Sequence, residues 1–390
     1  MLPSFEVENF RTFSHLQIPH LGGVNLIVGR NNVGKTMLLE ALRLYAAEGD
    51  INAILGLLYD RDELLPLAGF EVEPRNVQPQ FASLFHGRVL PSANKSAIVL
   101  QTNPQDVHRV HVAIDSRSIS GKRDSGDYGS TTTTLPPLEK DVMLPVITVQ
   151  VGDGAPNVFS LAVSIRPNRE GWVVDKKRLA LAFVPAGGVE SKALARQWDA
   201  IALHTAAEEQ VIECLRVVAP IERVTSVEHP ANPSQRMFLA RIRGASEPVP
   251  LKSLGDGMVR MFQFALALES AKSKQTGMGT PARPLASNTA SADVDGAFLI
   301  DEVENGIHYT VLPDLWRFLF RMARLHKLQV FATTHSWDCV EAFQKAAAEE
   351  KESDGMLIRL EKRDDRIEHK VVTYTEQELA SATRFETEVR

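Results

Sequence analysis

The residues with the clearest chemical potential form an eight-residue stretch near the N-terminus, residues 29–36, with the glycine, lysine and threonine spacing of a phosphate-binding loop. In such a loop the backbone N–H groups surround the phosphates, Lys35 reaches the outer phosphates, and the Thr36 hydroxyl can hold Mg²⁺. Asn32 stands where many such loops have glycine, and asparagine also tolerates a left-handed backbone. The predicted nucleotide-binding residues of this loop are Gly29, Asn31, Asn32, Gly34, Lys35 and Thr36.

The segments on either side of this loop fit the same role. Residues 24–28 form an apolar run with strand character, and residues 37–42 open a helix whose side chains Leu38, Leu39 and Leu42 recur at helical spacing. A strand, a glycine-bounded turn and a helix in that order are the context that a phosphate-binding loop requires. We therefore predict a nucleotide site here rather than a chance glycine turn.

Two adjacent carboxylates, Asp301 and Glu302, end the apolar strand predicted at residues 297–302. Because parallel α/β sheets place ligands outside the carboxyl ends of their strands, we expect this pair to face residues 29–36. In that position Asp301 would hold Mg²⁺ through water, and Glu302 would polarise the water that attacks the γ-phosphate. The alternative is a strand that runs into a solvated acidic turn.

A histidine follows a second apolar strand, predicted at residues 329–334. At the mouth of a nucleotide site His335 can contact the γ-phosphate and sense its hydrolysis, whereas most lone histidines are structural. Its position at the end of a strand favours the functional interpretation. Asp338 is placed near the cap of the next helix.

Composition narrows the class of protein. The chain has 390 residues, of which 44% are hydrophobic and 24% charged, as is ordinary for a soluble globular protein of two or three domains. The net charge of −6 is not the positive charge that is typical of a nucleic-acid-binding protein, although a local basic groove is compatible with it. The two cysteines, Cys214 and Cys339, are expected to be buried and reduced, which fits a cytoplasmic protein. Neither a secretory leader nor a membrane span is expected.

The order of the expected elements predicts an α/β protein with insertions. Residues 121–140, with four consecutive threonines, are expected to form a mobile loop. Residues 272–296 have almost no large apolar side chains and are expected to be a disordered linker. The other predicted divisions are a nucleotide-binding core lobe (1–50 and 297–390), a β-rich insertion (51–190) and a helical subdomain (191–271).

Motifs in this order resemble the ABC-class ATPase heads of the overcoming-lysogenization-defect (OLD) type and, more distantly, RecF and SMC heads. The resemblance covers nearly the whole chain, is specific only in the motifs, and is weak over residues 90–180. The matching segments are residues 9–13 for the opening motif, 29–36 for Walker A, 253–257 for the signature loop, 301–308 for Walker B and the D-loop, and 334–336 for the switch histidine.

The resemblance implies an ABC-type ATPase head, with a mixed sheet around a P-loop core and with β-rich and helical insertions, that uses ATP and Mg²⁺. In such heads the signature loop of one protomer presses on the γ-phosphate held by the other. Ser253, Gly255 and Gly257 suit that contact, because small residues allow close approach and the N-terminus of the following helix favours an anion. The signature register can be shifted by one residue, and the alternative is a glycine turn capped by Asp256.

Several features differ from larger relatives of this type. The stretch after His335 is too short for a C-terminal Toprim domain, so we expect no nuclease activity in this chain. The insertion lacks the heptads of SMC arms. The Q-loop residue stays open among Gln78, Gln80 and Gln150, and Arg11 is either a phosphate contact or a surface arginine.

The expected protein is an ATPase that sandwiches two ATP molecules between two copies of itself, as a homodimer or a higher oligomer. ATPases without their own nuclease domain resemble subunits of two-gene antiphage systems such as PARIS or Septu, in which a separate effector, such as a Toprim or HNH nuclease, is controlled. The alternative is a RecF/SMC-like ATPase that binds DNA in repair or recombination. A third interpretation is a scaffold that binds nucleotide without hydrolysing it. Glu302 argues against this interpretation, because it is predicted to polarise the attacking water.

Overall fold

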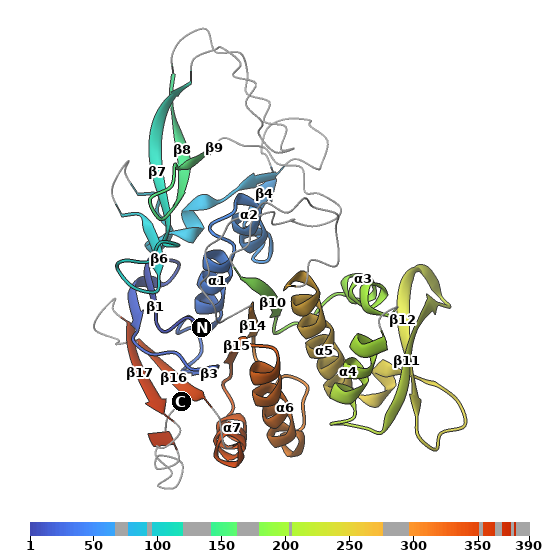
Figure 1. The fold of residues 1–390 in the computed structure, drawn as a ribbon. Helices are drawn as coiled ribbons and strands as arrows, with labels where there is room; N and C mark the ends of the chain where they lie inside the picture. The colour runs from blue at the N-terminus through green and yellow to red at the C-terminus, as the bar shows by residue number, and fades with distance from the viewer. Residues whose placement is uncertain are drawn as a thin grey trace.

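The computed structural model describes residues 1–66, 77–91, 96–119, 142–161, 179–202, 205–275, 296–350, 354–362, 369–375 and 378–379 (Figure 1). The predicted mobile loop at residues 121–140 lies outside this part of the chain, as does most of the predicted linker. Residues 272–275 of that linker are described, and they belong to a helix that ends at Gln275. Within the described residues, no helix is both long and apolar enough to cross a membrane.

The phosphate-binding loop follows the strand β3 of a six-stranded mixed sheet with the order β10-β14-β15-β3-β16-β17. From β10 to β16 each strand is parallel to its neighbour, and β17 pairs antiparallel with β16. The strands β3, β14 and β15 are buried at every position, as expected for a parallel sheet covered on both faces. The strands are β3 (Val24–Val28), β10 (Ala180–Val184), β14 (Gly296–Ile300), β15 (Leu328–Thr333), β16 (Gly355–Lys362) and β17 (His369–Thr375).

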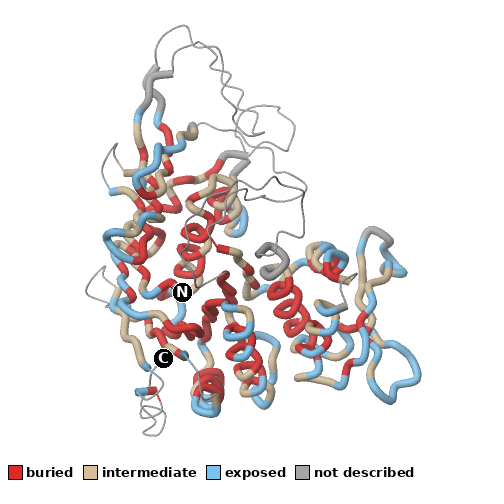
Figure 2. Tube along the Cα trace, in the orientation of Figure 1, coloured by how far each residue is buried: buried red, intermediate tan, exposed pale blue. Residues whose placement is uncertain are grey.

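Two hydrophobic cores cover the two faces of this sheet. Alternate residues of β3 point to opposite faces, so Leu26 and Val28 pack in the core shared with α5, α6 and α7, whereas Ile27 packs in the core shared with α1. Buried residues run through these helices and the sheet in Figure 2. The helices are α1 (Lys35–Ala46), α5 (Asp256–Gln275), α6 (Leu312–Leu325) and α7 (Trp337–Glu349). The predicted α/β class, a mixed sheet around a P-loop core, is confirmed.

A second six-stranded sheet, with the order β2-β1-β6-β7-β8-β9, is antiparallel throughout and shares a core with α1. The strand pairing divides the chain differently from the predicted boundaries: β1 and β2 join the strands of the β-rich insertion, and β10 joins the core sheet. The physical reason is that β1 forms its ladder with β6 and β10 forms its ladder with β14. The strands are β1 (Phe5–Phe10), β2 (Phe13–Ile18), β6 (Ile98–Gln101), β7 (Val110–Ile119), β8 (Val142–Val151) and β9 (Asn157–Ser160).

The segment from residue 191 to α5 begins with two helices and continues with a three-stranded sheet that lies beside them (Figure 1). A short 3-10 turn, η3, connects this sheet to α5. These elements are α3 (Ser191–Ile201), α4 (Thr205–Leu215), β11 (Ile221–His229), β12 (Asn232–Ile242), β13 (Val249–Pro250) and η3 (Leu251–Leu254). Between α1 and β6 lie α2 (Ile51–Tyr59), β4 (Leu64–Pro66), β5 (Val77–Pro79), η1 (Phe81–Leu84) and η2 (His86–Arg88), and η4 (Tyr309–Val311) precedes α6.

Candidate nucleotide-binding site

The loop between β3 and α1 has the backbone that a phosphate cradle requires. Gly29 (φ 147°), Asn32 (φ 62°) and Gly34 (φ 104°) all have positive φ, so the left-handed conformation expected of Asn32 is present. A Cβ atom at Gly34 would lie 2.7 Å from a Thr12 side-chain carbon and 2.8 Å from a Phe13 ring carbon, so a larger residue there would displace these side chains. No side chain caps α1, so its first N–H groups are available to an anion.

Lys35, the first residue of α1, turns its side chain back over this loop. Its Nζ atom donates hydrogen bonds to the carbonyl oxygens of Gly29 (2.7 Å) and Arg30 (3.2 Å). Burial lowers the pKa of Lys35, while the carboxylates of Glu302 and Asp301 act in the opposite direction. Lys35 is therefore positioned between the loop backbone and the acidic residues, in reach of a phosphate bound by the loop.

Asp301 lies directly beyond β14, is 6% exposed, and reaches across to the end of the phosphate-binding loop. Its carboxylate oxygens accept hydrogen bonds from the Thr36 hydroxyl at 3.1 and 3.0 Å, and Oδ1 also accepts one from the Thr333 hydroxyl at 2.6 Å. Carboxylate and hydroxyl oxygens are the hard ligands that Mg²⁺ prefers. Thr36 and Asp301, the residues predicted to hold Mg²⁺, are therefore in contact with one another, and their role as metal ligands stays a prediction.

Glu302 follows with a left-handed backbone (φ 49°), which is uncommon for a residue other than glycine. Its N–H donates to the Thr333 hydroxyl (2.8 Å), and its carboxylate accepts a hydrogen bond from the Asn305 side chain (3.3 Å). Its carbonyl oxygen accepts from the Asn305 N–H (3.0 Å) and from Arg260 (3.2 Å). The carboxylate lines the pocket beside the phosphate-binding loop. A general base for water must be fixed at such a point, so the geometry suits the role predicted for Glu302.

His335 comes just after β15 and contacts the acidic turn, which is formed by residues 301–304. Its backbone N–H donates to Glu304 Oε1 (3.0 Å), and its ring Nδ1 lies 3.3 Å from the same oxygen. A carboxylate at one ring nitrogen fixes the orientation of an imidazole. The cap of α7 is Ser336, whose hydroxyl accepts from the Cys339 N–H, and Asp338 lies in the first turn of that helix.

These groups surround a pocket of about 490 Å³. Its lining contains most of the residues predicted from the sequence, and it adds Met37 and Arg61. Gly29 lies at the base of the loop, and the predicted signature residues do not line the pocket of their own chain. The lining residues are Asn31, Asn32, Gly34, Lys35, Thr36, Met37, Arg61, Asp301, Glu302 and His335.

The predicted signature residues lie at the junction of η3 and α5. Ser253 is in η3, Gly255 has φ 95°, and Gly257 is in the first turn of α5. A Cβ atom at Gly257 would lie 2.9 Å from the Gly306 carbonyl oxygen, so this turn packs closely on the segment after Glu302. Their predicted contact with the nucleotide of a second protomer stays a prediction.

Sequence reasoning missed two arginines. Arg61 lies just beyond α2, in a stretch without a recognisable motif, and it enters the pocket only because the chain folds back on α1. Its Nε atom donates to Glu40 of α1 at 2.5 Å. Arg260, in the first part of α5, is 5% exposed and donates to the carbonyl oxygens of Asp301 and Glu302. Arg260 lies outside the motif of residues 253–257, so no signal in the sequence pointed to it.

Both interpretations of Arg11 from the sequence are wrong. It is neither a phosphate contact nor a surface residue: it is 6% exposed and makes ion pairs with Glu40 (3.0 Å) and Glu63 (2.5 Å). Of the Q-loop candidates, Gln80 and Gln150 do not line the pocket, and the side chain of Gln78 lies outside the described part of the chain.

Both cysteines are buried, as expected. Burial raises the pKa of the Cys214 and Cys339 thiols, so they are poor thiolate nucleophiles.

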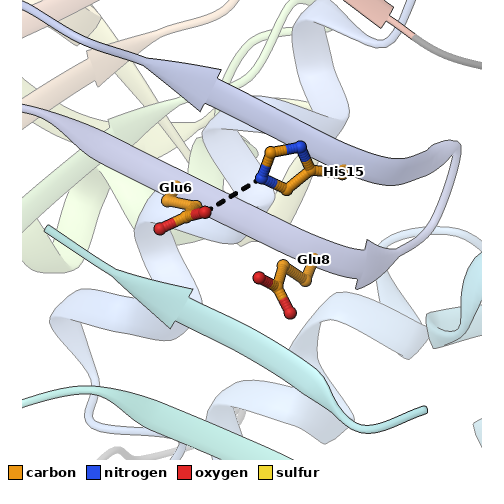
Figure 3. A group of neighbouring side chains, drawn as sticks. All are labelled: Glu6, Glu8 and His15. Atoms are coloured by element: carbon orange, nitrogen blue, oxygen red, sulfur yellow. Dashed lines mark hydrogen bonds and ion pairs between the residues drawn. The ribbon is translucent and has the colours of Figure 1, made fainter. Parts of the chain in front are cut away.

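A separate group of carboxylates and a histidine lies on the β1–β2 hairpin, away from this pocket (Figure 3). His15 Nε2 lies 2.9 Å from one oxygen of Glu6, and Gln101 donates to the other at 2.7 Å. Burial acts to raise the pKa of Glu6, but these hydrogen bonds outweigh it and lower the pKa. With Glu8 opposite His15 across the strands, this is a cross-strand polar cluster in which both carboxylate oxygens of Glu6 already have partners.

Two family models match the chain. The model described as "AAA ATPase domain" matches residues 1–101, which include the phosphate-binding loop. The model described as "AAA domain, putative AbiEii toxin, Type IV TA system" matches residues 194–338, which include Asp301, Glu302 and His335. The chain is an ATPase, as predicted. This supports the ABC-like ATPase part of the resemblance.

Known proteins similar to this ATPase align over most of its length. The "ATP/GTP phosphatase" of Helicobacter pylori is 22% identical over 385 residues, covering 94% of this chain and 93% of the relative. A solved SMC head bound to the C-winged helix domain of ScpA covers 96% of this chain and 98% of its own, with TM-score 0.46 and 13% identity. The SMC head domain from Thermotoga maritima covers 95% and 98%, with TM-score 0.41 and 10% identity.

The position of Arg61 leads to a testable expectation. We expect Arg61→Gln to weaken ATP binding by about 10- to 100-fold, because one charge-assisted hydrogen bond to a phosphate contributes about 1.5–3 kcal/mol. The matched control is Arg88→Gln: Arg88 pairs with Glu63 in the same ion-pair network but does not line the pocket. Titration of both variants with a fluorescent ATP analogue compares them, and equal affinities would remove Arg61 from the nucleotide site.

Proposed function

We propose that this ATPase is a switch in which two copies of the chain sandwich two ATP molecules, and in which ATP binding and hydrolysis control a separate effector protein. One observation carries the proposal. The pocket gathers every predicted catalytic group of one protomer, from Lys35 to Glu302 and His335, while Ser253, Gly255 and Gly257 lie outside it, in η3 and at the start of α5. A second copy would complete the site.

The groups present in one protomer have separate roles in hydrolysis. The loop N–H groups and Lys35 bind the phosphates, and Thr36 with Asp301 would hold Mg²⁺, which neutralises charge that builds on the phosphate oxygens. Glu302 accepts a proton from the attacking water, and His335, which lines the same pocket, would contact the γ-phosphate. None of the described residues that line the pocket belongs to the predicted signature loop, so a second copy would supply donors on the far side of that phosphate.

The signature segment is built to supply such donors. Gly255 has φ 95°, and among the described residues no atom lies within 4 Å of where its Cβ would be, so the loop faces open space. The first N–H groups of α5 follow directly, and a helix N-terminus favours a phosphate. A left-handed glycine with free space in front of a helix is what close docking of a nucleotide needs.

The effector is proposed to be a protein encoded separately. The resemblance to ATPase subunits of antiphage systems supports a Toprim or HNH nuclease, and the net charge of −6 favours a protein over DNA as the main ligand. ATP is the proposed nucleotide. The name of the Helicobacter pylori relative, an ATP/GTP phosphatase, makes GTP a second nucleotide to compare.

The dimer is tested by measuring molecular mass in solution by light scattering with no nucleotide, ADP, ATP and GTP, each with Mg²⁺. We expect a shift from monomer to dimer with ATP alone, because the nucleotide binds the closed state more tightly. A mass that does not respond to ATP would contradict the sandwich. Stimulation of hydrolysis by duplex DNA, without any effect of a co-encoded protein, would favour the RecF/SMC-like alternative.

The signature contact has its own prediction. Gly255→Trp is expected to reduce turnover by about 100-fold, because the side chain blocks the approach of the partner's phosphate and the donors it needs. ATP binding by the isolated protomer should not change, since Gly255 does not line its own pocket. Gly244→Trp is the matched control: Gly244 also has positive φ (82°) and nothing described within 4 Å of a Cβ, so both variants place a large side chain at a positive-φ glycine that faces open space. Equal turnover in both variants would contradict the composite site.

A further inference from the structure

Arg260 is a buried charge that makes no direct ion pair among the described residues. Burial lowers its pKa to about 10, and the carboxylates of Asp301, Glu302 and Glu304 act in the opposite direction without touching it. A buried guanidinium without a carboxylate partner destabilises a fold unless its donors are satisfied in another way. Such a residue calls for a functional explanation.

The two terminal nitrogens of Arg260 donate to main-chain carbonyl groups around the general base and to the Gln263 side chain, whereas its buried Nε has no hydrogen-bond partner among the described residues. One terminal nitrogen donates to the carbonyl oxygens of Asp301 (2.6 Å) and Glu302 (3.2 Å), and the other donates to that of Pro185 (2.6 Å). These bonds hold the peptide units on both sides of the Glu302 Cα atom, where the backbone is left-handed. The direction of the Glu302 side chain is therefore fixed in part from α5.

A second contact joins the same two segments. Gly257, in the first turn of α5, lies so close to Gly306 that a Cβ atom would come within 2.9 Å of its carbonyl oxygen. Gly306 itself has φ 74° and faces the backbone of Asp256. The first turn of α5 and residues 302–306 thus pack backbone against backbone, and Arg260 adds hydrogen bonds one turn further along. Movement of one segment requires movement of the other.

We propose that Arg260 is a positioning residue that couples the signature loop of each protomer to the Glu302 of that same protomer. This rests on the proposed ATP-sandwich dimer. In that dimer the signature loop contacts ATP bound by the partner, whereas Glu302 acts on ATP bound by its own chain. Arg260 therefore connects the two composite sites, and the two ATP molecules are hydrolysed cooperatively.

The physical reason is the sensitivity of catalysis to small displacements. Closure of residues 253–257 on the partner's phosphate shifts α5, and the Arg260 guanidinium carries that shift to the two carbonyl groups next to Glu302. A displacement of about 1 Å of a catalytic group can change the rate about 100-fold. Occupancy of one site therefore sets the population of the productive Glu302 position in the other.

The test compares Arg260→Lys and Arg260→Met with the wild-type dimer. Lysine keeps the charge but loses the planar fork that reaches two carbonyl groups. We expect Arg260→Lys to reduce kcat by about 10- to 100-fold with ATP affinity unchanged, and to lower the Hill coefficient of hydrolysis from above 1 to about 1. Arg260→Met should reduce kcat further.

The control is Leu266→Ala, also on α5 and fully buried, whose apolar side chain makes no hydrogen bond to the acidic turn. It should lower Tm while the Hill coefficient stays at the wild-type value, which separates coupling from simple loss of stability. If Arg260→Lys forms the ATP-dependent dimer and keeps both kcat and the Hill coefficient, the coupling is overturned and the proposed switch stands. If the wild-type protein forms no ATP-dependent dimer, the proposed function fails, and the coupling fails with it.

Discussion

Glu302→Gln is expected to reduce ATP turnover by about 10²- to 10⁴-fold, the usual contribution of a positioned general base. Glutamine has the shape of glutamate but cannot accept the proton of the attacking water. ATP binding should be retained, because the phosphates are held by the loop and by Lys35 rather than by Glu302. The variant should therefore accumulate as an ATP-loaded dimer, since closure proceeds and hydrolysis does not follow.

Two measurements check this expectation: release of inorganic phosphate under saturating ATP, and mass in solution after incubation with ATP and Mg²⁺. The matched control is Glu341→Gln, which removes a carboxylate from the exposed face of α7 outside the pocket. It should hydrolyse ATP at the wild-type rate. Wild-type turnover by Glu302→Gln would show that another group activates the water.

The parts of the site that the sequence predicted are those determined by local order. The strand, glycine turn and helix around Lys35 are contiguous, and each of the acidic and histidine motifs directly follows its own apolar strand. The parallel ladder β14-β15-β3 then brings the three strand ends to one edge of the sheet. Local pattern together with one topological rule was enough to place Asp301, Glu302 and His335.

What the sequence did not predict depends on pairing between distant segments. Nothing near β1 indicates that it pairs with β6, and nothing near β10 indicates that it joins the core sheet beside β14. Both strands have ordinary alternating or apolar patterns that fit either sheet. The predicted lobe boundaries followed chain order, whereas the ladders join strands that are distant in the sequence.

The buried ion pairs of Arg11 with Glu40 and Glu63 could not be predicted for the same reason. Arg11 comes from the turn between β1 and β2, Glu40 from α1, and Glu63 from the segment after α2. Each looks like an ordinary surface charge in its own segment, and only the fold desolvates them together. Because Arg61 shares Glu40 with Arg11, this cluster also sets the position of the pocket arginine.

Lys35→Ala is expected to have the largest effect on nucleotide binding. The ammonium group would replace its present bonds to the loop carbonyl groups by charge-assisted bonds to the outer phosphates. Two such bonds contribute about 3–6 kcal/mol, so ATP affinity should fall by roughly 10²- to 10⁴-fold, below what an ordinary assay detects. Dimer formation with ATP should be lost as well.

Thermal unfolding provides the measurement, because a ligand that binds only the folded protein stabilises it by about 2.7 kcal/mol at 100 times Kd. ATP with Mg²⁺ should raise the Tm of the wild-type protein and of Glu302→Gln but not that of Lys35→Ala. Lys345→Ala, an exposed lysine on α7, is the control and should respond like the wild type. A full ATP response by Lys35→Ala would mean that the loop N–H groups alone hold the phosphates, and that Lys35 acts only in hydrolysis. The comparison with Glu302→Gln thus separates binding from chemistry within one pocket.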